Sequence, residues 1–303
     1  MSVRRSPATN KPYGIKRVCR AWDMPRSSLY ARRKAADAQP AANPVERAPR
    51  GPKPKLSDAE LWLLIKQELD KSLFCSEGHR PVWRRLQRKG IIVSKKRVLR
   101  LTREHNYLAP SRRRQGTKCE HTGSITTQRP NELWGTDGIM FYTQAEGKCW
   151  TFFCVDHFNS ECMGWHAVKR GDRFAALEPI RQGLVREFGA VGEQIANGLA
   201  LRMDHGTQYT SEYFQREIKF FGIRPSFAYV AEPETNGIAE RFGKTLKEQV
   251  LEGAQFRNLE EARAAIETFI KNYNWHWLPE KLEHFGFLAP AEARAFWFDN
   301  MAA

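Results

Sequence analysis

The chain has 303 residues and a formal net charge of +15, which gives enough length for two or three domains. No apolar run approaches the roughly 18 residues of a membrane span, and the N-terminus leads into no apolar signal core, so we expect an intracellular protein. The six cysteines form no CxxC pair, which argues against a structural zinc site or a disulfide framework.

The positive charge is concentrated in the first part of the chain. Residues 1–130 contain 31 Lys and Arg against 10 Asp and Glu, a net charge of +21, whereas residues 131–303 contain 18 against 24, a net charge of −6. Phosphate contacts supply most of the non-specific affinity of proteins for nucleic acid. Residues 1–130 are therefore expected to be the nucleic-acid-binding part.

The first segment, residues 1–36, is basic and predicts two short helices. In the first helix Ile15, Val18 and Trp22 share one side, and Asp23-Met24-Pro25 separates it from a second helix that starts at Ser27. Two interpretations stay open, a helix-turn-helix and a basic arm that becomes ordered on DNA, because two short helices have too little core to stand alone. Residues 37–55, rich in Ala, Pro and Arg, predict a linker.

Residues 56–110 predict a domain of three helices. Ser57 and Glu60 form a capping box at the start of the first helix, whose inward positions are Leu61, Leu64, Ile65 and Leu69. The second helix has Pro81 in its first turn and ends at Gly90. Ser94 caps the third helix, which runs to His105. This pattern is typical of a helix-turn-helix domain.

The third helix of this domain is strongly basic. Val98 and Leu101 can face the core, while the exposed positions are Lys95, Lys96, Arg97, Arg100 and Arg103. We expect this side to enter a DNA major groove; the alternative is a solvated basic helix that touches phosphates without sequence selectivity. A basic connector, residues 111–130, follows and is expected to track the DNA backbone through Arg112, Arg113 and Arg114.

The remaining chain alternates strands and helices. Three strand-like runs come first, and the first of them carries Asp137. They are followed by a helix at 173–188, a strand that ends at Asp204, a helix at 211–221, a short strand at 223–229 and a helix at 237–253. This order predicts a mixed α/β sheet with helices on both faces.

Two further features of this part concern chemistry. Asp204 lies where a buried strand ends in a loop, and 35 residues separate it from Glu240. Glu240 lies off the apolar stripe of its helix and shares a side with Lys244 and Lys247. That side is suited to a metal ion and a phosphate backbone, although a Glu-Lys pair on an ordinary solvated helix would look the same.

Three motifs carry a family resemblance: Trp134-Gly-Thr-Asp137, Asp204-His-Gly-Thr-Gln-Tyr-Thr-Ser211 and Asn236-Gly-Ile-Ala-Glu240-Arg-Phe-Gly-Lys-Thr-Leu-Lys247. They resemble the acidic motifs of the retroviral-integrase superfamily, and most closely those of the OrfB transposases of the insertion-sequence-three group. The resemblance covers most of the chain. It implies a ribonuclease-H-like catalytic core at residues 131–275 and a DDE triad at Asp137, Asp204 and Glu240.

The resemblance also implies the cofactor and further site residues. The triad would hold two Mg²⁺ ions, with Mn²⁺ as a substitute; Asp137 would bridge both ions, Asp204 would hold one and Glu240 the other. Carboxylates are ligands that Mg²⁺ prefers, and two such ions suffice for phosphodiester cleavage without a protein nucleophile. The expected DNA contacts of the core are His205, Gln208, Asn236, Arg241, Lys244 and Lys247.

The end of the chain departs from the family pattern. After the predicted helix at 259–273 comes Trp275-His276-Trp277, where relatives carry an arginine. These aromatic side chains are expected to fill a core, and stacking on DNA bases is the alternative. Residues 276–303 are predicted to be a C-terminal tail.

Together these patterns predict a metal-dependent DNA transposase, a polynucleotidyl transferase that acts in the transposition, integration and recombination of a bacterial insertion sequence. Its expected partners are the terminal inverted repeats of its element, target DNA, further copies of itself, and an upstream element-encoded protein (OrfA), separate or fused by frameshifting. It is expected in the bacterial cytoplasm at the nucleoid. The alternatives are a ribonuclease-H-like nuclease that cuts without joining, and a non-catalytic DNA-binding protein derived from a transposase.

Overall fold

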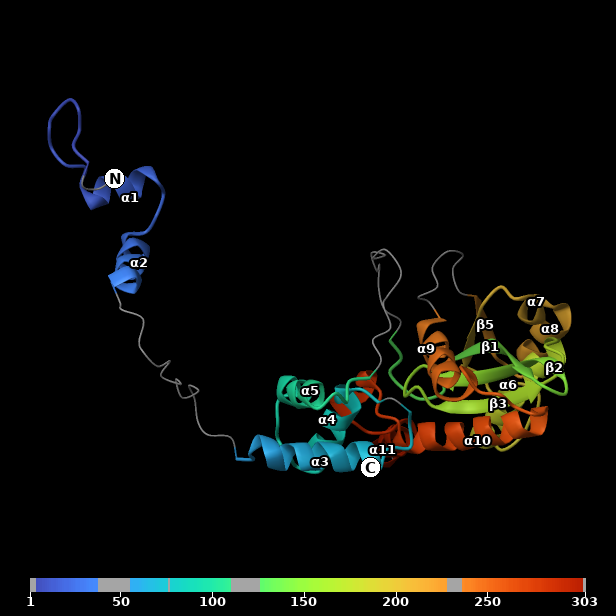
Figure 1. The fold of residues 1–303 in the computed structure, drawn as a ribbon. Helices are drawn as coiled ribbons and strands as arrows, with labels where there is room; N and C mark the ends of the chain where they lie inside the picture. Colours follow the sequence, from blue (N-terminus) through green and yellow to red (C-terminus); the bar gives the residue numbers. More distant parts are fainter. Residues whose placement is uncertain (1–3, 38–54, 76, 110–125, 228–235, 302–303) are drawn as a thin grey trace. The chain divides into compact units, whose positions relative to one another are not determined.

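The computed structural model describes residues 4–37, 55–75, 77–109, 126–227 and 236–301 (Figure 1). The chain divides into two compact units, Met1–Lys55 and Leu56–Ala303. Arg112, Arg113 and Arg114, and most of the expected linker and connector, lie outside the described residues. Within the described part of the chain, no helix is both long enough and apolar enough to cross a membrane.

The first unit contains two helices with almost no core. They are α1 (Ile15–Ala21) and α2 (Arg26–Asp37). Cys19 is the one buried side chain of α1, and α2 has none. Trp22, expected on the apolar side of the first helix, is 64% exposed. The helices therefore exist as predicted, and the choice between a helix-turn-helix and a basic arm stays open.

Residues 56–109 form the expected three-helix domain, with α3 (Asp58–Asp70), α4 (His79–Arg88) and α5 (Lys95–Glu104). The capping box is present, because the Ser57 and Glu60 side chains each accept a hydrogen bond from the other residue's backbone N–H. Ser94 caps α5 in the same way by accepting from the backbone N–H of Arg97. The core consists of apolar side chains from all three helices: Leu61, Ile65, Val82, Leu86, Val98 and Leu101.

The second part of this unit contains a five-stranded sheet. Its strands are β1 (Leu133–Thr143), β2 (Gly147–Asp156), β3 (Cys162–Val168), β4 (Ala200–Met203) and β5 (Arg224–Phe227), in the order β3-β2-β1-β4-β5. β1, β2 and β3 pair antiparallel, whereas β4 pairs parallel with both β1 and β5. The predicted mixed sheet is confirmed.

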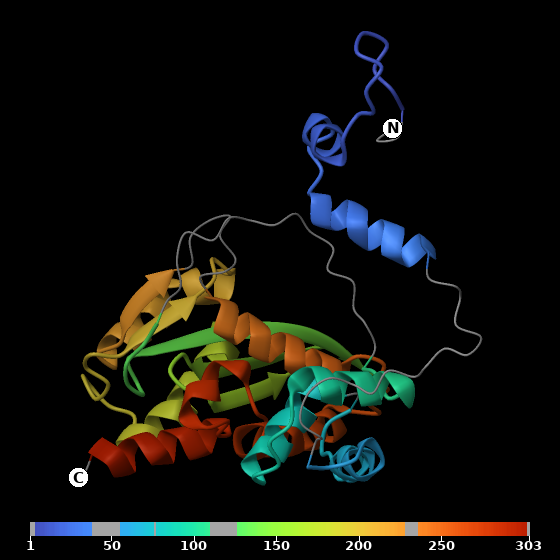
Figure 2. The same cartoon turned by 90° about the vertical axis from the view of Figure 1, so that its left-hand side faces the viewer.

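Helices cover both faces of the sheet. One face, here the α6 face, carries α6 (Arg173–Phe188), α7 (Thr207–Thr210) and α8 (Glu212–Phe220). The other, the α9 face, carries α9 (Gly237–Leu246), the π-helical turn η2 (Lys247–Leu251) and α10 (Leu259–His276). Both Figure 1 and Figure 2 show α9 lying over the strands. Because strand side chains alternate, Trp134 and Phe152 face α6 while Phe141 and Phe153 face α9.

The C-terminal segment is folded, although residues 276–303 were expected to be a tail. It forms η3 (Glu280–Phe285) and α11 (Pro290–Met301). Arg294 of α11 is 6% exposed and pairs with three acids, Asp156 at 2.5 Å, Glu161 at 2.7 Å and Glu187 at 2.5 Å. A buried charge needs such partners, so α11 is part of the packing of the sheet domain.

The aromatic run before this segment divides into two environments. Trp277 packs edge-on against Phe74, with ring centroids 4.9 Å apart, and stacks on Tyr273. Trp275 is 57% exposed. The expectation that these aromatic side chains fill a core is therefore correct for Trp277 and wrong for Trp275.

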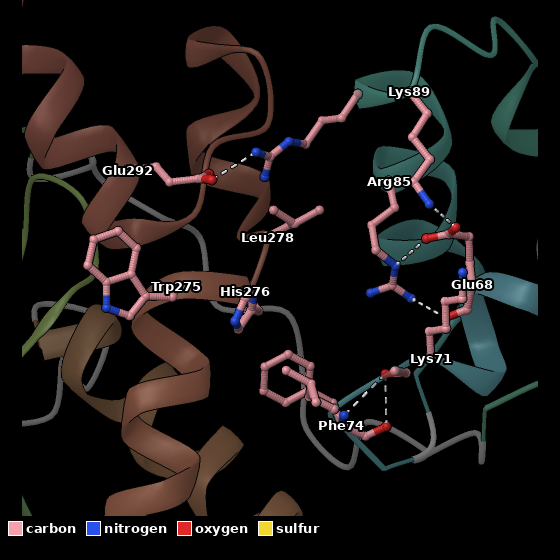
Figure 3. Close-up of a pocket in the computed structure, with 12 residues that line it drawn as sticks. Glu68, Lys71, Phe74, Arg85, Lys89, Trp275, His276, Leu278 and Glu292 are labelled. Atoms are coloured by element: carbon pink, nitrogen blue, oxygen red, sulfur yellow. Dashed lines mark hydrogen bonds and ion pairs between the residues drawn. The ribbon is translucent and has the colours of Figure 1, made fainter.

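The three-helix domain contacts the end of the core. Arg80 pairs with Glu280 at 2.8 Å, and Arg88 pairs with Glu292 at 2.9 Å. Beside the Arg88–Glu292 pair lies a cavity of about 620 Å³, lined on one side by Lys89, which pairs with Glu68, and on the other by Trp275 (Figure 3). None of the three predicted catalytic acids lines this cavity. The three acids lie instead on β1, directly after β4 and on α9.

Candidate active site

The sheet brings the first two acids together. β1 and β4 run parallel, and their last recorded pair is Gly135 with Arg202. Asp137 and Asp204 each come two residues after that pair, and Asp204 follows directly on β4. Adjacent strands lie about 4.8 Å apart, and residues two apart point to the same face. The two carboxylates therefore start from neighbouring positions at the same end of neighbouring strands.

α9 places the third acid at the same level. A Cβ atom on Gly135 would lie 3.3 Å from Cβ of Ala239, and one on Gly243 would lie 3.2 Å from Cδ1 of Ile139. α9 therefore runs along β1, with Ala239 above Gly135 and Gly243 above Ile139. Glu240 lies between these two contacts, beside Asp137, and its side chain is exposed.

The pKa of Asp137 also indicates that Asp204 and Glu240 are close to it. Burial, together with the negative charges of Asp204 and Glu240, raises the pKa of Asp137 to about 6, against the opposing effect of a hydrogen bond from the Gly138 backbone N–H. That bond measures 2.7 Å, and the Gly206 N–H donates to Asp204 Oδ1 at 2.8 Å. A carboxylate whose proton affinity is raised by two neighbouring carboxylates favours a bound cation.

The donor set fits a hard divalent ion. Carboxylate oxygens from three separate elements are ligands suited to Mg²⁺. Among the residues that the structure describes, however, no three His, Cys, Asp or Glu side chains lie close enough to form a metal site. The three acids are neighbours that would have to draw together around a cation.

Asn236 directly precedes α9 and connects the start of this helix to β1. It is 3% exposed, and its Nδ2 donates to the Thr136 carbonyl at 3.1 Å. The sequence motif predicted a DNA contact here. Its buried position instead suits a residue that fixes the start of the helix carrying Glu240.

His157 is a second buried polar residue beside Gly135, and it was not among the residues predicted from the sequence. It is 2% exposed and follows β2 directly, so its only signal was a histidine after Asp156. Burial, then the charges of Lys281 and Arg202, lower the pKa of His157 to about 3. The ring is therefore neutral at physiological pH.

The close approach of α9 to β1 depends on Gly135. A Cβ there would lie 2.9 Å from both Asn236 Oδ1 and His157 Nε2. We expect Gly135→Ala to push α9 outward, to lower the free energy of unfolding by about 1–3 kcal/mol and to reduce DNA joining. Urea unfolding and a joining assay would measure both effects. Gly237→Ala is the matched control, because a Cβ at Gly237 meets nothing within 4 Å; equal losses in the two variants would contradict this role.

The other predicted DNA contacts of the core are near the surface. His205 stacks on Phe227 with ring centroids 5.2 Å apart, and Gln208 is half-buried in α7. Arg241, Lys244 and Lys247 are exposed on α9 and η2. His205 and Gln208 follow Asp204 in the chain, and the three basic residues follow Glu240 on the same helical segment.

The basic side chains of α5 are not equivalent. Arg97 and Arg100 both pair with Asp58, at 2.7 Å and 2.6 Å, and thereby fasten α5 to the start of α3. Lys95 lies over the ring of Trp83 at 4.7 Å. Lys96 and Arg103 are the remaining members of the predicted set, and both are exposed.

Comparison with protein families agrees with this geometry. An integrase core domain model matches residues 127–233, and a second integrase core domain model matches residues 221–278, so that together they span half of the chain. An HTH-like domain model matches residues 56–115, which include α3, α4 and α5.

Individual relatives show the same likeness. The chain is 26% identical over 207 residues to the transposase InsD for insertion element IS2 of Escherichia coli, covering 66% of this chain and 68% of that protein. Among solved structures, it resembles the catalytic core domain of BIV integrase at 16% identity and a TM-score of 0.41, covering 57% of this chain and 99% of that one. The HTLV-2 integrase catalytic core domain in complex with magnesium is similar at 16% identity and a TM-score of 0.40, covering 54% of this chain and 96% of that one. With two integrase core domain models matching residues 127–278 and an HTH-like domain model matching the residues before them, the chain belongs to the integrase core domain family, as an OrfB-type transposase of a bacterial insertion sequence.

Proposed function

We propose that this chain cleaves the DNA 3′ ends of its own insertion element and joins them to target DNA, with Asp137, Asp204 and Glu240 as the catalytic and metal-holding residues. The observation that carries the proposal is the convergence of these three carboxylates from β1, the end of β4 and α9. Three acids at one place, with no side-chain nucleophile required, suit in-line attack on a phosphodiester.

Divalent ions bound by the three carboxylates, Mg²⁺ or Mn²⁺, would supply the Lewis acid that activates the attacking hydroxyl and stabilises the leaving oxygen. The chain's own contribution is to hold the acids and the DNA. Asn236 fixes the start of α9 and thereby the position of Glu240. Lys244 and Lys247, exposed beyond Glu240, would attract the phosphates on either side of the reacting bond.

The HTH-like domain would supply recognition of the element's terminal inverted repeats. Of its third helix, Lys96 and Arg103 are the exposed side chains best placed to reach DNA. The basic segments outside the described residues, with Arg112, Arg113 and Arg114, would add phosphate contacts. We further propose that copies of the chain assemble on paired element ends in the bacterial cytoplasm, alone or with the element's upstream protein.

A joining assay tests the proposed chemistry. Labelled duplexes that carry the element's ends are incubated with the wild type, Glu240→Gln and Glu248→Gln, in Mg²⁺ and in EDTA. We expect Glu240→Gln to lower joining about a thousandfold, because loss of a metal ligand costs several kcal/mol of transition-state stabilisation. Glu248→Gln is the matched control on η2; its pair with Lys244 is long, at 3.9 Å, and the lysine is 61% exposed, so little should change.

Other outcomes would redirect the assignment. Cleavage without joining by the wild type would indicate a nuclease. Joining that persists in EDTA, or in Glu240→Gln, would remove the metal site or Glu240 from the mechanism. DNA binding without chemistry, even after addition of the upstream protein, would indicate a non-catalytic binding protein.

A further inference from the structure

A group of basic and aromatic side chains lies at the far end of β1 and β2, away from the three acids. Lys148, which pairs with Tyr142 across the β1–β2 hairpin, lies over the ring of Trp150 at 5.3 Å. The turn after β3 folds onto the same ring, because a Cβ on Gly171 would be 2.6 Å from it. Lys169 and Arg170, in that turn, are both exposed.

The group continues onto two helices of the α6 face. Phe174, at the start of α6, is 51% exposed and contacts Tyr213 of α8, with ring centroids 4.7 Å apart. Arg173 lies over the Phe174 ring at 5.0 Å, and Arg216 lies over the Tyr213 ring at 5.5 Å. A cavity of about 570 Å³, lined by Val168, Lys169, Arg170 and Phe174 among others, joins the strand part to the helix part. We call the whole the basic–aromatic surface.

The charge of this surface contrasts with that of its surroundings. Residues 131–303 carry a net charge of −6. The basic–aromatic surface nevertheless gathers five basic side chains: Lys148, Lys169, Arg170, Arg173 and Arg216. Of the acids beside it, Asp172 is occupied in capping α6, Glu217 pairs with Arg181, and Glu178 lines the cavity. The surface is locally positive and fits a polyanion.

The distance between the basic–aromatic surface and the three acids indicates which polyanion the surface binds. β1 runs from Asp137 to the surface, and Tyr142 is five residues beyond Asp137. Five residues of a strand span roughly 17 Å, which is about half of one turn of B-DNA. Asp137 shares the α9 face of the sheet with Gly135 and Ile139, whereas Trp150 and Tyr213 pack on the α6 face, so a DNA that contacts both passes around the edge of the sheet.

We propose that the basic–aromatic surface holds the DNA backbone on the α6 side of the sheet, outside the site of the three acids. The five cations contact phosphates, and the exposed ring of Phe174 packs against a sugar or an unpaired base. The stacking of Lys148, Arg173 and Arg216 on neighbouring rings keeps these side chains extended along the surface, which reduces the entropy lost on binding. The proposal rests on the proposed function only in taking DNA as the substrate.

The test is DNA binding by the full chain in EDTA, where no chemistry occurs. Fluorescence anisotropy with a labelled duplex that carries the element's end compares the wild type with Lys169→Ala/Arg170→Ala and with Phe174→Ala at several salt concentrations. The matched control is Arg257→Ala/Lys271→Ala, which removes the same charge from exposed positions on the α10 side. We expect the Lys169/Arg170 variant to bind roughly tenfold more weakly and to lose about two from the slope of log affinity against log salt. Phe174→Ala should weaken binding with little change in this slope.

The outcomes separate the inference from the proposed function. Equal effects in the Lys169/Arg170 variant and the control, or no effect in either, would overturn the inference, whether or not the wild type joins DNA in Mg²⁺. Weakened binding in the Lys169/Arg170 variant alone would support it, even if the same wild-type preparation failed to join DNA and the proposed function fell.

Discussion

Replacing Asp137 with asparagine should abolish DNA cleavage and joining and, in the same molecule, raise the stability of the metal-free protein at neutral pH. The first effect follows from the loss of one of the three carboxylates that we propose hold the metal, and we expect a decrease of at least about a thousandfold in the joining rate. The second follows from the cost of ionising Asp137 beside two other acids. A residue kept for chemistry at the expense of stability is expected at a catalytic site.

The pH dependence has a definite sign. Burial and the charges of Asp204 and Glu240 raise the pKa of Asp137 from its ordinary value of 3.8 to about 6. Between these two pH values the folded state holds the proton more tightly than the unfolded state, so the wild type loses stability as pH rises. Above pH 6 the whole cost remains, and for this half-buried side chain we expect about 1–3 kcal/mol.

Urea unfolding in EDTA at pH 4, 5 and 8 would measure this effect. Asp137→Asn should unfold at higher urea than the wild type at pH 8, and the difference should shrink toward pH 4. Added Mg²⁺ should stabilise the wild type more than the variant. Asp299→Asn, at an exposed position of α11, is the control and should match the wild type throughout. A variant that is less stable than the wild type at pH 8 would contradict the like-charge cluster.

The sequence predicted best those features whose signal is local. α6 was expected at residues 173–188 and has these bounds, because Asp172 caps its first turn and Gly189 ends it with φ of 81°. The succession of strands and helices along the chain was predicted from turn signals in the same way. The three acids were found through the motif words around them, and the parallel register of β1 and β4 then explains why two of them are neighbours.

What the sequence could not give depends on partners far along the chain. Arg97 and Arg100 looked like free DNA contacts because Asp58, which pairs with both, lies 39 and 42 residues before them. Asn236 was predicted to contact DNA, yet its side chain donates to the Thr136 carbonyl, 100 residues away. Arg294 gave no signal at all, since a single arginine among apolar residues of a helix indicates no buried network.

Replacing Arg294 should have the second large effect. We expect Arg294→Met to lower the free energy of unfolding by about 3–5 kcal/mol at pH 8, because it leaves Asp156, Glu161 and Glu187 without their central cation. Asp156 and Glu161 are almost fully buried, at 0% and 1% exposed. Burial already raises the pKa of Asp156, and loss of the Arg294 charge would raise it further. The deficit should therefore become smaller as the pH falls toward 5 and the Asp156 carboxyl takes up a proton.

Urea unfolding of three further variants separates unpaired charge from lost packing. Arg257→Met removes a cation from an exposed pair with Glu261 and should cost less than about 1 kcal/mol. Arg294→Met combined with Asp156→Asn and Glu161→Gln should regain part of the lost stability, because fewer uncompensated charges stay in the core. Arg186→Met gives an intermediate case, since Arg186 reaches Glu161 and Glu187 from a partly exposed position. If Arg294→Met were no more harmful than Arg257→Met, α11 would not be held by this network, and residues 276–303 would behave as the tail that their sequence predicts.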